Sequence, residues 1–364
     1  MDALDGLRGF AVLIVILSHT SNSGMFFLPS LNFGGIGKSG VYLFFLLSSF
    51  LLAMPLIRKG AAIFSFHVMY NYWQRRFFRI YPLYTLYLLI GLLSTWFFAE
   101  ILDKHGVGVP FELDMEHFIN HITLQEGKGV TWSIAVEFKF YFLLPIIAYI
   151  IYVIRSRFGL WASLTLFVIL LWLSQEISPQ SESTVNDARL LPYMPIFLAG
   201  MFLSLVQLEI NKKGKYGESI VVGCKYLGYA GVVGIFAMTP LVFSMFGSNV
   251  AGNHFHKQFI MYSILWSFVI LSAVNSRGVI KSFFELPLLR FYGAISFGIY
   301  LFHPVFIGII RSLSMESHLS AWLVLLVSTV FATISFKLIE APASKLNINK
   351  ETLLIWLKIK SPAK

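Results

Sequence analysis

The sequence has very little charge and almost no cysteine. Charged residues make up 13% of the 364 positions, and Cys224 is the single cysteine. One cysteine excludes an intrachain disulfide and any metal site built from several thiolates. A glycine-rich phosphate loop, a Gly-x-Ser-x-Gly elbow and a His-Glu-x-x-His sequence are also missing. The usual signatures of P-loop proteins, serine hydrolases and zinc proteases are therefore absent.

Long apolar runs stand where the charge is missing. Hydrophobic residues make up 57% of the chain, and the mean hydropathy is +0.74. Repeated runs near the length that a bilayer requires predict transmembrane helices. We therefore expect an all-α polytopic membrane protein with about ten spans and a cytosolic amino terminus. The expected spans are 7–27, 36–57, 79–100, 132–154, 158–174, 190–208, 226–246, 258–275, 290–312 and 319–340.

The loops between these runs indicate the orientation. With a cytosolic amino terminus, most of the 28 lysines and arginines fall on the cytosolic side, as the positive-inside rule requires. The longest outer loop, 101–131, is acidic. A net charge of +10 placed between apolar runs indicates anionic lipid and an anionic cytosolic ligand as partners, and argues against nucleic acid.

The first apolar run carries two basic side chains. Its leader holds Asp2 and Asp5 beside Arg8, and no small-residue cleavage site follows, so we expect a retained span and not a signal peptide. Arg8 and His19 are eleven positions apart, which on a helix is one face and about 16 Å. An ionisable residue inside a span is a functional-site hypothesis, and imidazole can act as a general base. The alternative is a headgroup anchor with a histidine cap.

Three arginines lie in the second cytosolic loop. Arg75, Arg76 and Arg79 have three- and four-residue spacing, so their guanidinium groups cluster if the segment is helical. Arginine forks match phosphate groups bidentately. The segment is either an ordinary positive-inside anchor or a clamp for the phosphates of a nucleotide-like cofactor.

Polar residues inside the fourth span form a second candidate. Ser133, Glu137 and Tyr141 share one helix face, and Lys139 lies off that face. Glu137 therefore needs a partner from another helix or a proton. It is either half of a structural ion pair or a site residue that orients His19 or contacts an acceptor hydroxyl.

The ninth span carries a polar stripe of Ser296, Tyr300 and His303, followed by Pro304. The stripe is either polar contact between helices or part of a site. Measured along their helices from the cytosolic edge, His303 reaches about 18 Å and His19 about 16 Å. The two imidazoles are therefore expected at similar depth.

Two weaker patterns remain. Glu340 stands three residues from Lys337, which favours a surface ion pair. Asp114, His117 and His121 have a spacing that a metal could use, but such spacing is common without a metal. We predict no metal site.

Taken together, five motifs in order resemble the membrane-bound acyltransferase-3 family, the multi-span O-acyltransferases of bacterial surface polysaccharides. The resemblance covers nearly the whole chain. The motifs are Asp5-Gly6-Leu7-Arg8-Gly9 with His19; Arg76-Phe77-Phe78-Arg79-Ile80-Tyr81-Pro82; Trp132-Ser133-Ile134-Ala135-Val136-Glu137-Phe138 with Tyr141 and Pro145; Ser296-Phe297-Gly298-Ile299-Tyr300-Leu301-Phe302-His303; and Glu340 with Pro342.

The resemblance implies acetyl-CoA as the cytosolic acyl donor. Arg8, Arg76 and Arg79 match the basic residues expected near the CoA phosphates, and His19 matches the histidine taken as catalytic. The run Glu137-Phe138-Lys139 departs from the family's frequent Glu-Glu or Glu-x-Gln.

We expect residues 1–345 to form the membrane-embedded acyltransferase domain and residues 346–364 a short basic cytosolic tail with an interfacial helix. Family members often carry a further extracytoplasmic esterase-like domain, which this sequence does not show. Acceptor chemistry is then expected in the membrane domain or on a separate partner.

The resulting interpretation is an O-acetyltransferase of the bacterial inner membrane. His19 deprotonates an acceptor hydroxyl or briefly carries the acetyl group, and Glu137 orients or neutralises it. The acceptor is a hydroxyl of a lipid-linked or exported glycan, such as O-antigen, capsule or exopolysaccharide. Two alternatives remain open: a transporter or flippase for a lipid-linked sugar, and an acyltransferase acting on a small secreted metabolite.

Overall fold

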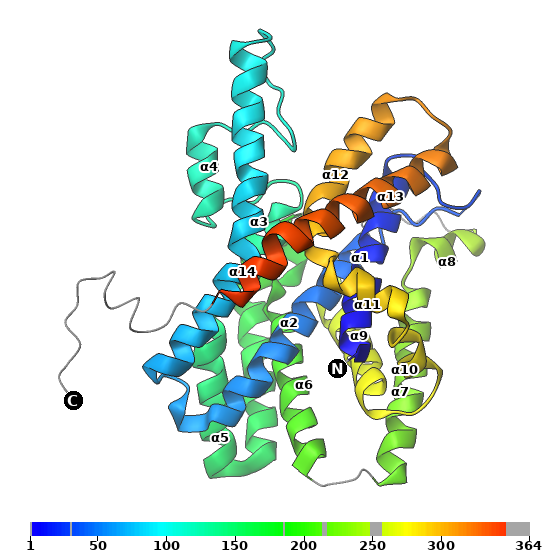
Figure 1. The fold of residues 1–364 in the computed structure, drawn as a ribbon. Coiled ribbons are helices and arrows are strands. Elements are labelled where there is room, and N and C mark those ends of the chain that lie inside the picture. The colour runs from blue at the N-terminus through cyan, green and yellow to red at the C-terminus, as the bar shows by residue number, and fades with distance from the viewer. Residues whose placement is uncertain (1, 30, 185, 213–216, 248–256, 347–364) are drawn as a thin grey trace, which may run out of the picture.

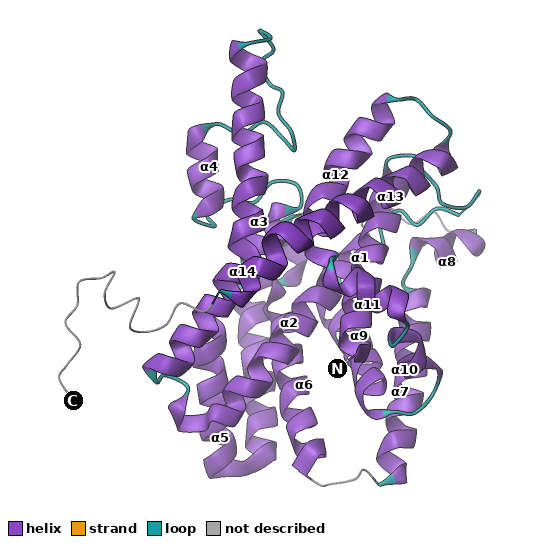
Figure 2. Cartoon of the chain, viewed as in Figure 1, coloured by secondary structure: helices purple, strands orange, loops and turns teal. Residues whose placement is uncertain are grey.

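The computed structural model describes residues 2–29, 31–184, 186–212, 217–247 and 257–346. Every regular element in these ranges is a helix, and Figure 2 shows no strand among them. The helices are α1 Asp2–Asn22, α2 Gly37–Lys59, η1 Gly60–Ala62, α3 Phe66–Glu100, α4 Met115–Ile122, α5 Thr131–Ile177, η2 Gln180–Glu182, η3 Leu191–Tyr193, α6 Met194–Lys212, α7 Glu218–Ala237, α8 Pro240–Met245, α9 Phe259–Asn275, α10 Val279–Phe284, α11 Pro287–Ala294, α12 Ser296–Ser312, α13 Ser317–Ser335, the π-helix η5 Phe336–Glu340 and α14 Ala341–Lys345.

The chain is an all-α polytopic membrane protein, as expected. Among the described residues, seven helical stretches are long and apolar enough to cross a membrane, and the bent pair α11–α12 makes an eighth. Gly159 (φ 83°) divides α5 into two helices, and α9 is apolar but only 17 residues long. With these two included, each of the expected spans falls on a helix.

Three expected boundaries were wrong. Helix α3 begins at Phe66, well before 79, so the arginine segment belongs to a helix and not to a loop. The expected span 226–246 is α7 followed by the separate α8, because Thr239 precedes Pro240 and takes an extended conformation. The expected span 290–312 breaks at Ile295, where α11 and α12 meet at 76°. The predicted tail 346–364 lies outside the described residues from 347 onward.

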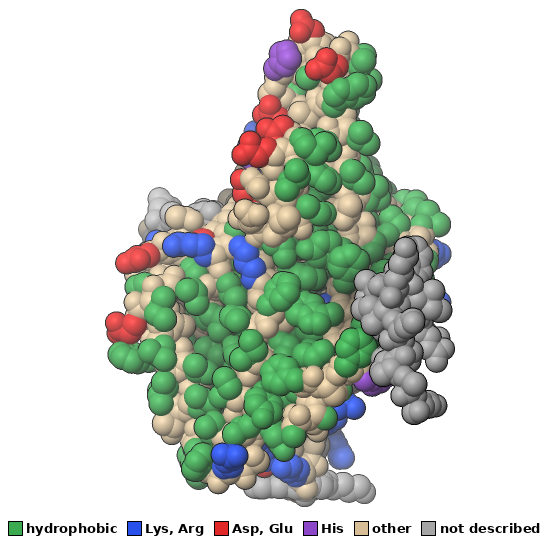
Figure 3. Space-filling view, turned by 90° about the vertical axis from the view of Figure 1, so that its left-hand side faces the viewer, with side chains coloured by type: hydrophobic (Ala, Val, Ile, Leu, Met, Phe, Trp, Pro, Cys, Tyr) green, Lys and Arg blue, Asp and Glu red, His purple; other side chains and the backbone are tan. Residues whose placement is uncertain are grey.

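The surface shows the polarity of a membrane protein. In Figure 3, hydrophobic side chains cover a broad band and acidic side chains gather on the projection at the top, whereas basic side chains lie along the lower edge and also at mid-height, where a few acidic ones accompany them. The projection contains the end of α3 and the following acidic loop with α4 (Figure 1). This separation of charge fits a cytosolic lower edge, which remains a prediction.

Helix α1 runs through the middle of the molecule and touches α11 almost backbone to backbone (Figure 1). A Cβ atom on Gly6 would lie 1.7 Å from the carbonyl oxygen of Phe284, and one on Gly9 would lie 1.9 Å from that of Leu289. A Cβ on Gly293 would lie 2.0 Å from the carbonyl oxygen of Asp5. Small residues permit such close helix contacts in membranes, and this contact fixes α1 against the bent pair α11–α12.

Helix α2 packs on the opposite side of α1 in the same manner. A Cβ on Gly40 would lie 2.5 Å from the carbonyl oxygen of Ala11, and one on Gly37 would lie 3.1 Å from the side chain of Ser18. Helices α5 and α6 complete the surroundings of α2. Helix α1 is therefore held between α2 and α11–α12, with both of its basic residues inside the bundle.

The glycine contact gives a first prediction. Gly9→Ala should lower the melting temperature of the detergent-solubilised protein, because the added methyl group must push α11 away and overpacking costs about 1–3 kcal/mol. Gly223→Ala in α7 is the matched control, since nothing lies within 4 Å of its added Cβ. Equal melting temperatures for the two variants would show that the contact of α1 with α11 is looser than described.

Candidate active site

A basic cavity of about 530 Å³ opens at the inner end of α1. Five arginines line it, with two carboxylates, and they come from α1, α3, α11 and η5. The charged lining residues are Asp5, Arg8, Arg75, Arg76, Arg79, Arg290 and Glu340. The excess of guanidinium groups makes this cavity a site for an anion with several charges.

Helix geometry brings the arginines together. Arg75, Arg76 and Arg79 lie in about the third and fourth turns of α3, where their spacing points them to one side. Arg8 is held 3.6 Å from Asp5 on α1. Arg290 lies at the start of the bend and pairs with Asp2 at 3.1 Å.

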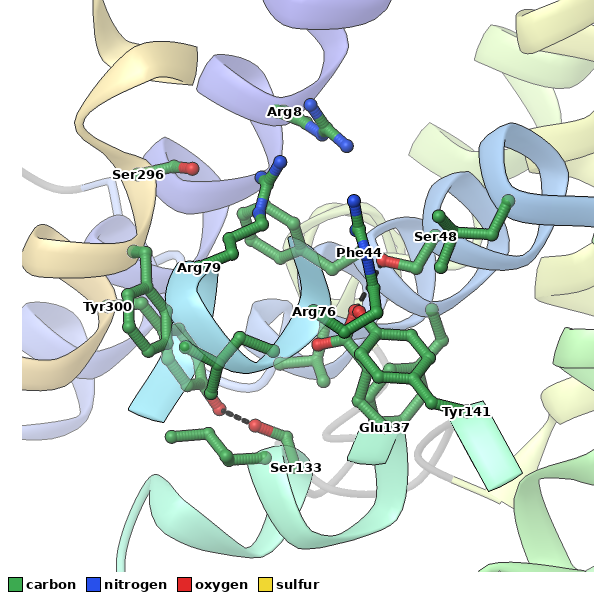
Figure 4. Close-up of a pocket in the computed structure, with 16 residues that line it drawn as sticks. Arg8, Phe44, Ser48, Arg76, Arg79, Ser133, Glu137, Tyr141, Ser296 and Tyr300 are labelled. Atoms are coloured by element: carbon green, nitrogen blue, oxygen red, sulfur yellow. Dashed lines mark hydrogen bonds between the residues drawn. The ribbon is translucent and has the colours of Figure 1, made fainter. Parts of the chain in front are cut away.

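A narrower cavity of about 70 Å³ continues from the basic one toward the middle of the bundle. The two share Arg8, Arg76, Arg79 and Ser296 in their walls. Figure 4 shows the three guanidinium groups directed toward this space from one side. The two cavities are therefore successive parts of one path.

Glu137 lies in the wall of the middle cavity and accepts two short hydrogen bonds (Figure 4). Ser48 Oγ of α2 and the hydroxyl of Tyr141 both donate to Glu137 Oε1 at 2.5 Å. Two hydroxyl donors on one carboxylate oxygen offset part of the cost of burying it. The predicted face of Ser133, Glu137 and Tyr141 is thus present, and Ser48 supplies the contact from another helix.

Tyr300 stands where the middle cavity meets an outer one. Its hydroxyl is hydrogen-bonded to Ser133 Oγ at 2.7 Å and lies 3.2 Å from the carbonyl oxygen of Val130. Tyr300 and Val41 line both cavities. The three cavities therefore lie in series with shared walls, and Tyr300 with its bond to Ser133 stands between the middle one and the outer one.

The outer cavity, of about 570 Å³, contains the side chain of His19 in its wall. His19 Nδ1 lies 2.7 Å from His303 Nε2, and the two rings stack at 24°. His303 is 0% exposed, and its Nδ1 lies 3.0 Å from the carbonyl oxygen of Ile299. The two histidines expected at similar depth are in direct contact.

These distances set the tautomers of a neutral histidine pair. A carbonyl oxygen only accepts, so His303 Nδ1–H donates to Ile299 and His303 Nε2 carries the lone pair. His19 Nδ1–H must then donate to His303 Nε2. His19 Nε2 is left with its lone pair and without a proton, which is the state that a base or a nucleophile requires.

Comparison with known proteins identifies the family of the chain. A family model described as "Acyltransferase domain" matches residues 1–338. The chain belongs to the acyltransferase-3 family. This confirms the resemblance drawn from the five motifs.

The curated relatives match nearly the whole of this chain and are themselves longer. The chain is 24% identical over 367 residues to "O-acetyltransferase OatA" of Staphylococcus aureus strain NCTC 8325 / PS 47, and equally to OatA of strain COL. Each alignment covers 95% of this chain and 57% of the relative, so the chain spans little more than half the length of these relatives. No solved structure matches the chain.

One expectation for this acyltransferase-3 chain needs correction. We expected Glu137 to orient or neutralise His19, but Glu137 lines the middle cavity and bonds to Ser48 and Tyr141. His303 occupies the orienting position instead. The reason is geometric, because Tyr300 and its bond to Ser133 lie between the two cavities.

Ser296 lies apart from the rest of its predicted stripe. It donates to the carbonyl oxygen of Gly293 at 2.9 Å and lines the two inner cavities. Tyr300 lines the outer cavity as well as the middle one, and His303 contacts His19. The expected ion pair of Glu340 with Lys337 is absent from the described residues. Glu340 turns into the basic cavity, where Ser335 lies 3.4 Å away.

The acidic outer loop uses its histidines for structure. Asp114 caps α4 by accepting from the backbone N–H of His117, and His117 Nδ1 lies 2.9 Å from Glu126. The bond to Glu126 raises the pKa of His117. His121 Nδ1 donates to the carbonyl oxygen of His117, and His121 Nε2 accepts from the backbone of Lys128. No group of metal ligands is found in the described ranges.

Sequence reasoning missed three lining residues. Arg290 counted only as a cytosolic charge, although it precedes Ser296 by little more than a turn of helix. Lys38 counted only as an outer charge, although it begins an apolar span beside Gly37. Ser48 gave no signal, because a serine within a span is common and its partner Glu137 lies far away in the sequence.

The histidine pair gives a second prediction. In protein labelled with nitrogen-15 histidine, NMR should show His19 protonated on Nδ1 and bare on Nε2. His303→Leu removes the acceptor, so His19 should become a mixture of tautomers. His67→Gln is the control, because His67 is exposed and bonds to Asn71. A proton on Nε2 of His19 in the unmodified protein would contradict the deduced chain of donors.

Proposed function

We propose that this acyltransferase-3 chain is an O-acetyltransferase of the bacterial inner membrane. It takes an acetyl group from cytosolic acetyl-CoA and transfers it to a hydroxyl of a surface or lipid-linked glycan. The observation that carries the proposal is the path of three cavities with shared walls, which begins at five arginines and ends at the bare nitrogen of His19.

The inner cavity suits the phosphate end of CoA. Guanidinium groups from α1, α3 and α11 surround it, and bidentate bonds to phosphate are the strong contacts of arginine. The middle cavity is too narrow for a nucleotide and suits the thin arm that carries the thioester. In this proposal the phosphates stay among Arg8, Arg76 and Arg79 while the thioester advances past Glu137 and Tyr300.

The outer cavity is where the acetyl group would be transferred from CoA to the acceptor. His19 Nε2 takes the proton of an acceptor hydroxyl, and the hydroxyl oxygen attacks the thioester carbonyl carbon. The C–S bond breaks, the new ester C–O bond remains, and the proton passes from His19 to the CoA sulfur. His303 holds His19 in the required tautomer throughout.

The acetyl-carrier alternative for His19 needs the same lone pair. In that case Nε2 attacks the thioester first and an acetyl-imidazole forms before the acceptor arrives. The two routes differ in the absence of acceptor, where only the carrier route leaves labelled acetyl on the protein.

The relatives support the reaction class. Their printed name is O-acetyltransferase, and we extend that activity to this chain. A flippase for a lipid-linked sugar would also place polar groups at mid-membrane, but it would not need an arginine-lined inner cavity that narrows toward a bare imidazole nitrogen.

The third prediction tests the reaction itself. Purified protein given radiolabelled acetyl-CoA and a glycan acceptor should release CoA and label the glycan. His19→Ala should lower the rate about 10²- to 10⁴-fold, the usual share of a general base, while it still inserts and unfolds normally. His303→Gln retains an acceptor oxygen and should keep more activity than His303→Leu. Full activity in His19→Ala would overturn the assignment, and glycan movement without label would favour the flippase.

The fourth prediction concerns the donor. Arg79→Gln should raise the KM for acetyl-CoA about tenfold or more, because a charge-assisted hydrogen bond contributes about 1.5–3 kcal/mol. Arg157→Gln is the matched control, since Arg157 is exposed on α5 and lines none of the three cavities. The effect should shrink with dephospho-CoA if Arg79 contacts the 3′-phosphate. Equal KM values in both variants would remove the arginines from the donor site.

A further inference from the structure

The wall of the outer cavity carries positive charge without carboxylates. Lys38 and Lys128 are among its lining residues, and none of the lining residues is Asp or Glu. The remaining polar groups there are neutral amides, hydroxyls and the imidazole of His19. A cavity of this composition has an electrostatic preference for an anion.

Lys38 lies in the wall of the cavity, and its contacts there are with uncharged groups. Its Nζ lies 3.8 Å above the ring centre of Trp132 and donates to Asn186 Oδ1 at 2.8 Å. In the described part of the chain, no carboxylate oxygen lies within ion-pair distance of this nitrogen. The two contacts orient the ammonium group, and neither neutralises it.

Asp187, the residue after Asn186, already forms an ion pair with Arg189. Asp187 receives Arg189 Nε at 3.0 Å and Arg189 Nη2 at 2.7 Å, and its side chain is 4% exposed. This bidentate pair satisfies Asp187 and leaves Lys38 to an amide oxygen. Asp187 is therefore not among the lining residues, and it acts on Lys38 only from beyond ion-pair distance.

Lys128 brings the second charge from a different segment, just before α5. Its ammonium lies 5.5 Å from the ring centre of Phe111, which also lines the cavity. Its backbone N–H is anchored by His121 Nε2 at 3.1 Å and by Thr131 Oγ1 at 2.9 Å. Among described residues, no carboxylate lies within ion-pair distance of Lys128 either.

From this arrangement we infer that the acceptor is an anionic sugar, whose carboxylate or phosphate is bound by Lys38 and Lys128 beside His19. The inference rests on the proposed function and narrows it, since a neutral sugar would leave Lys38 without an anion in the occupied cavity. Placing the acceptor's negative charge on the lysines also fixes which of its hydroxyls meets His19 Nε2.

The fifth prediction compares matched acceptors with and without the anion. With acetyl-CoA in excess, transfer is measured to glucose, glucuronate and glucose 1-phosphate. We expect kcat/KM to be at least about tenfold higher for one of the anionic sugars, the usual effect of a charge-assisted contact. Preference for glucuronate identifies a carboxylate, and preference for glucose 1-phosphate identifies a phosphate next to the sugar.

Variants connect the preference to the lysines. Lys38→Gln should bring the ratio of anionic to neutral acceptor close to one, and Lys38→Arg should restore it. Lys128→Gln, at an exposed position, should lower the ratio without a folding defect. Lys104→Gln is the matched control, since Lys104 is exposed and lies outside the cavity. An equal rate for glucose and both anions, unchanged in Lys38→Gln, overturns the inference while the acetyl transfer itself stands.

Binding separates the two proposals. Equilibrium dialysis with labelled glucuronate and glucose 1-phosphate needs no chemistry. Saturable binding of either anion that Lys38→Gln weakens supports the anionic site even if no acetyl transfer is found, in which case the proposed reaction fails alone. Binding equal to that of glucose, and unaffected by Lys38→Gln, counts against the anionic site.

Discussion

The contact of α1 with the bent pair α11–α12 is the constraint on which the rest of the structure depends. Gly9 and Gly293 bring α1 and α11 together, and Gly6 brings α1 against Phe284 at the end of α10, so the register between α1 and α11 is fixed. Polar groups along one are then fixed against polar groups along the other. Arg8 meets the wall that carries Ser296, and eleven residues later His19 meets His303. The close helix contacts that these glycines permit thus determine which polar atoms meet in the membrane.

Buried polar groups in this bundle are satisfied mostly by neutral partners. Glu137 is held by two hydroxyls, His303 by a carbonyl and an imidazole, and Tyr300 by Ser133. Hydrogen bonds of this kind offset desolvation without a second buried charge. In the wall of the outer cavity, His19 Nε2 and the ammonium groups of Lys38 and Lys128 keep unused hydrogen-bonding capacity. A bound substrate can supply the hydrogen-bond or ionic partners that these groups lack.

Much of the helical plan could be predicted, because hydropathy and spacing are local properties. The arginines of α3 cluster and Ser133, Glu137 and Tyr141 share a face for that reason. Depth along a helix is also local, so the similar depth of His19 and His303 followed from counting residues, whereas their contact did not. Contacts between residues of different helices are not local, because they depend on how the helices pack. Glu137 bonds to Ser48 and not to His19, which it was expected to orient. The bend at Ile295 places Arg290 in the same cavity as Arg8, and position 295 itself is neither proline nor glycine, so the sequence does not indicate the bend there.

Charge is arranged in order along the path, and this order bears on direction. Five arginines and two carboxylates line the inner cavity, three of those arginines and Glu137 line the narrow middle, and His19 with two lysines lines the outer cavity. In the proposed function the phosphates of the acyl-CoA stay with the arginines of the inner end, and the uncharged thioester arm is the part that enters the middle cavity beside Glu137. An anionic acceptor is attracted to the outer lysines and meets the same carboxylate if it moves inward. In the proposed function Glu137 would then disfavour the passage of either anion, while the uncharged thioester arm advances past it and the acetyl group is handed to the acceptor.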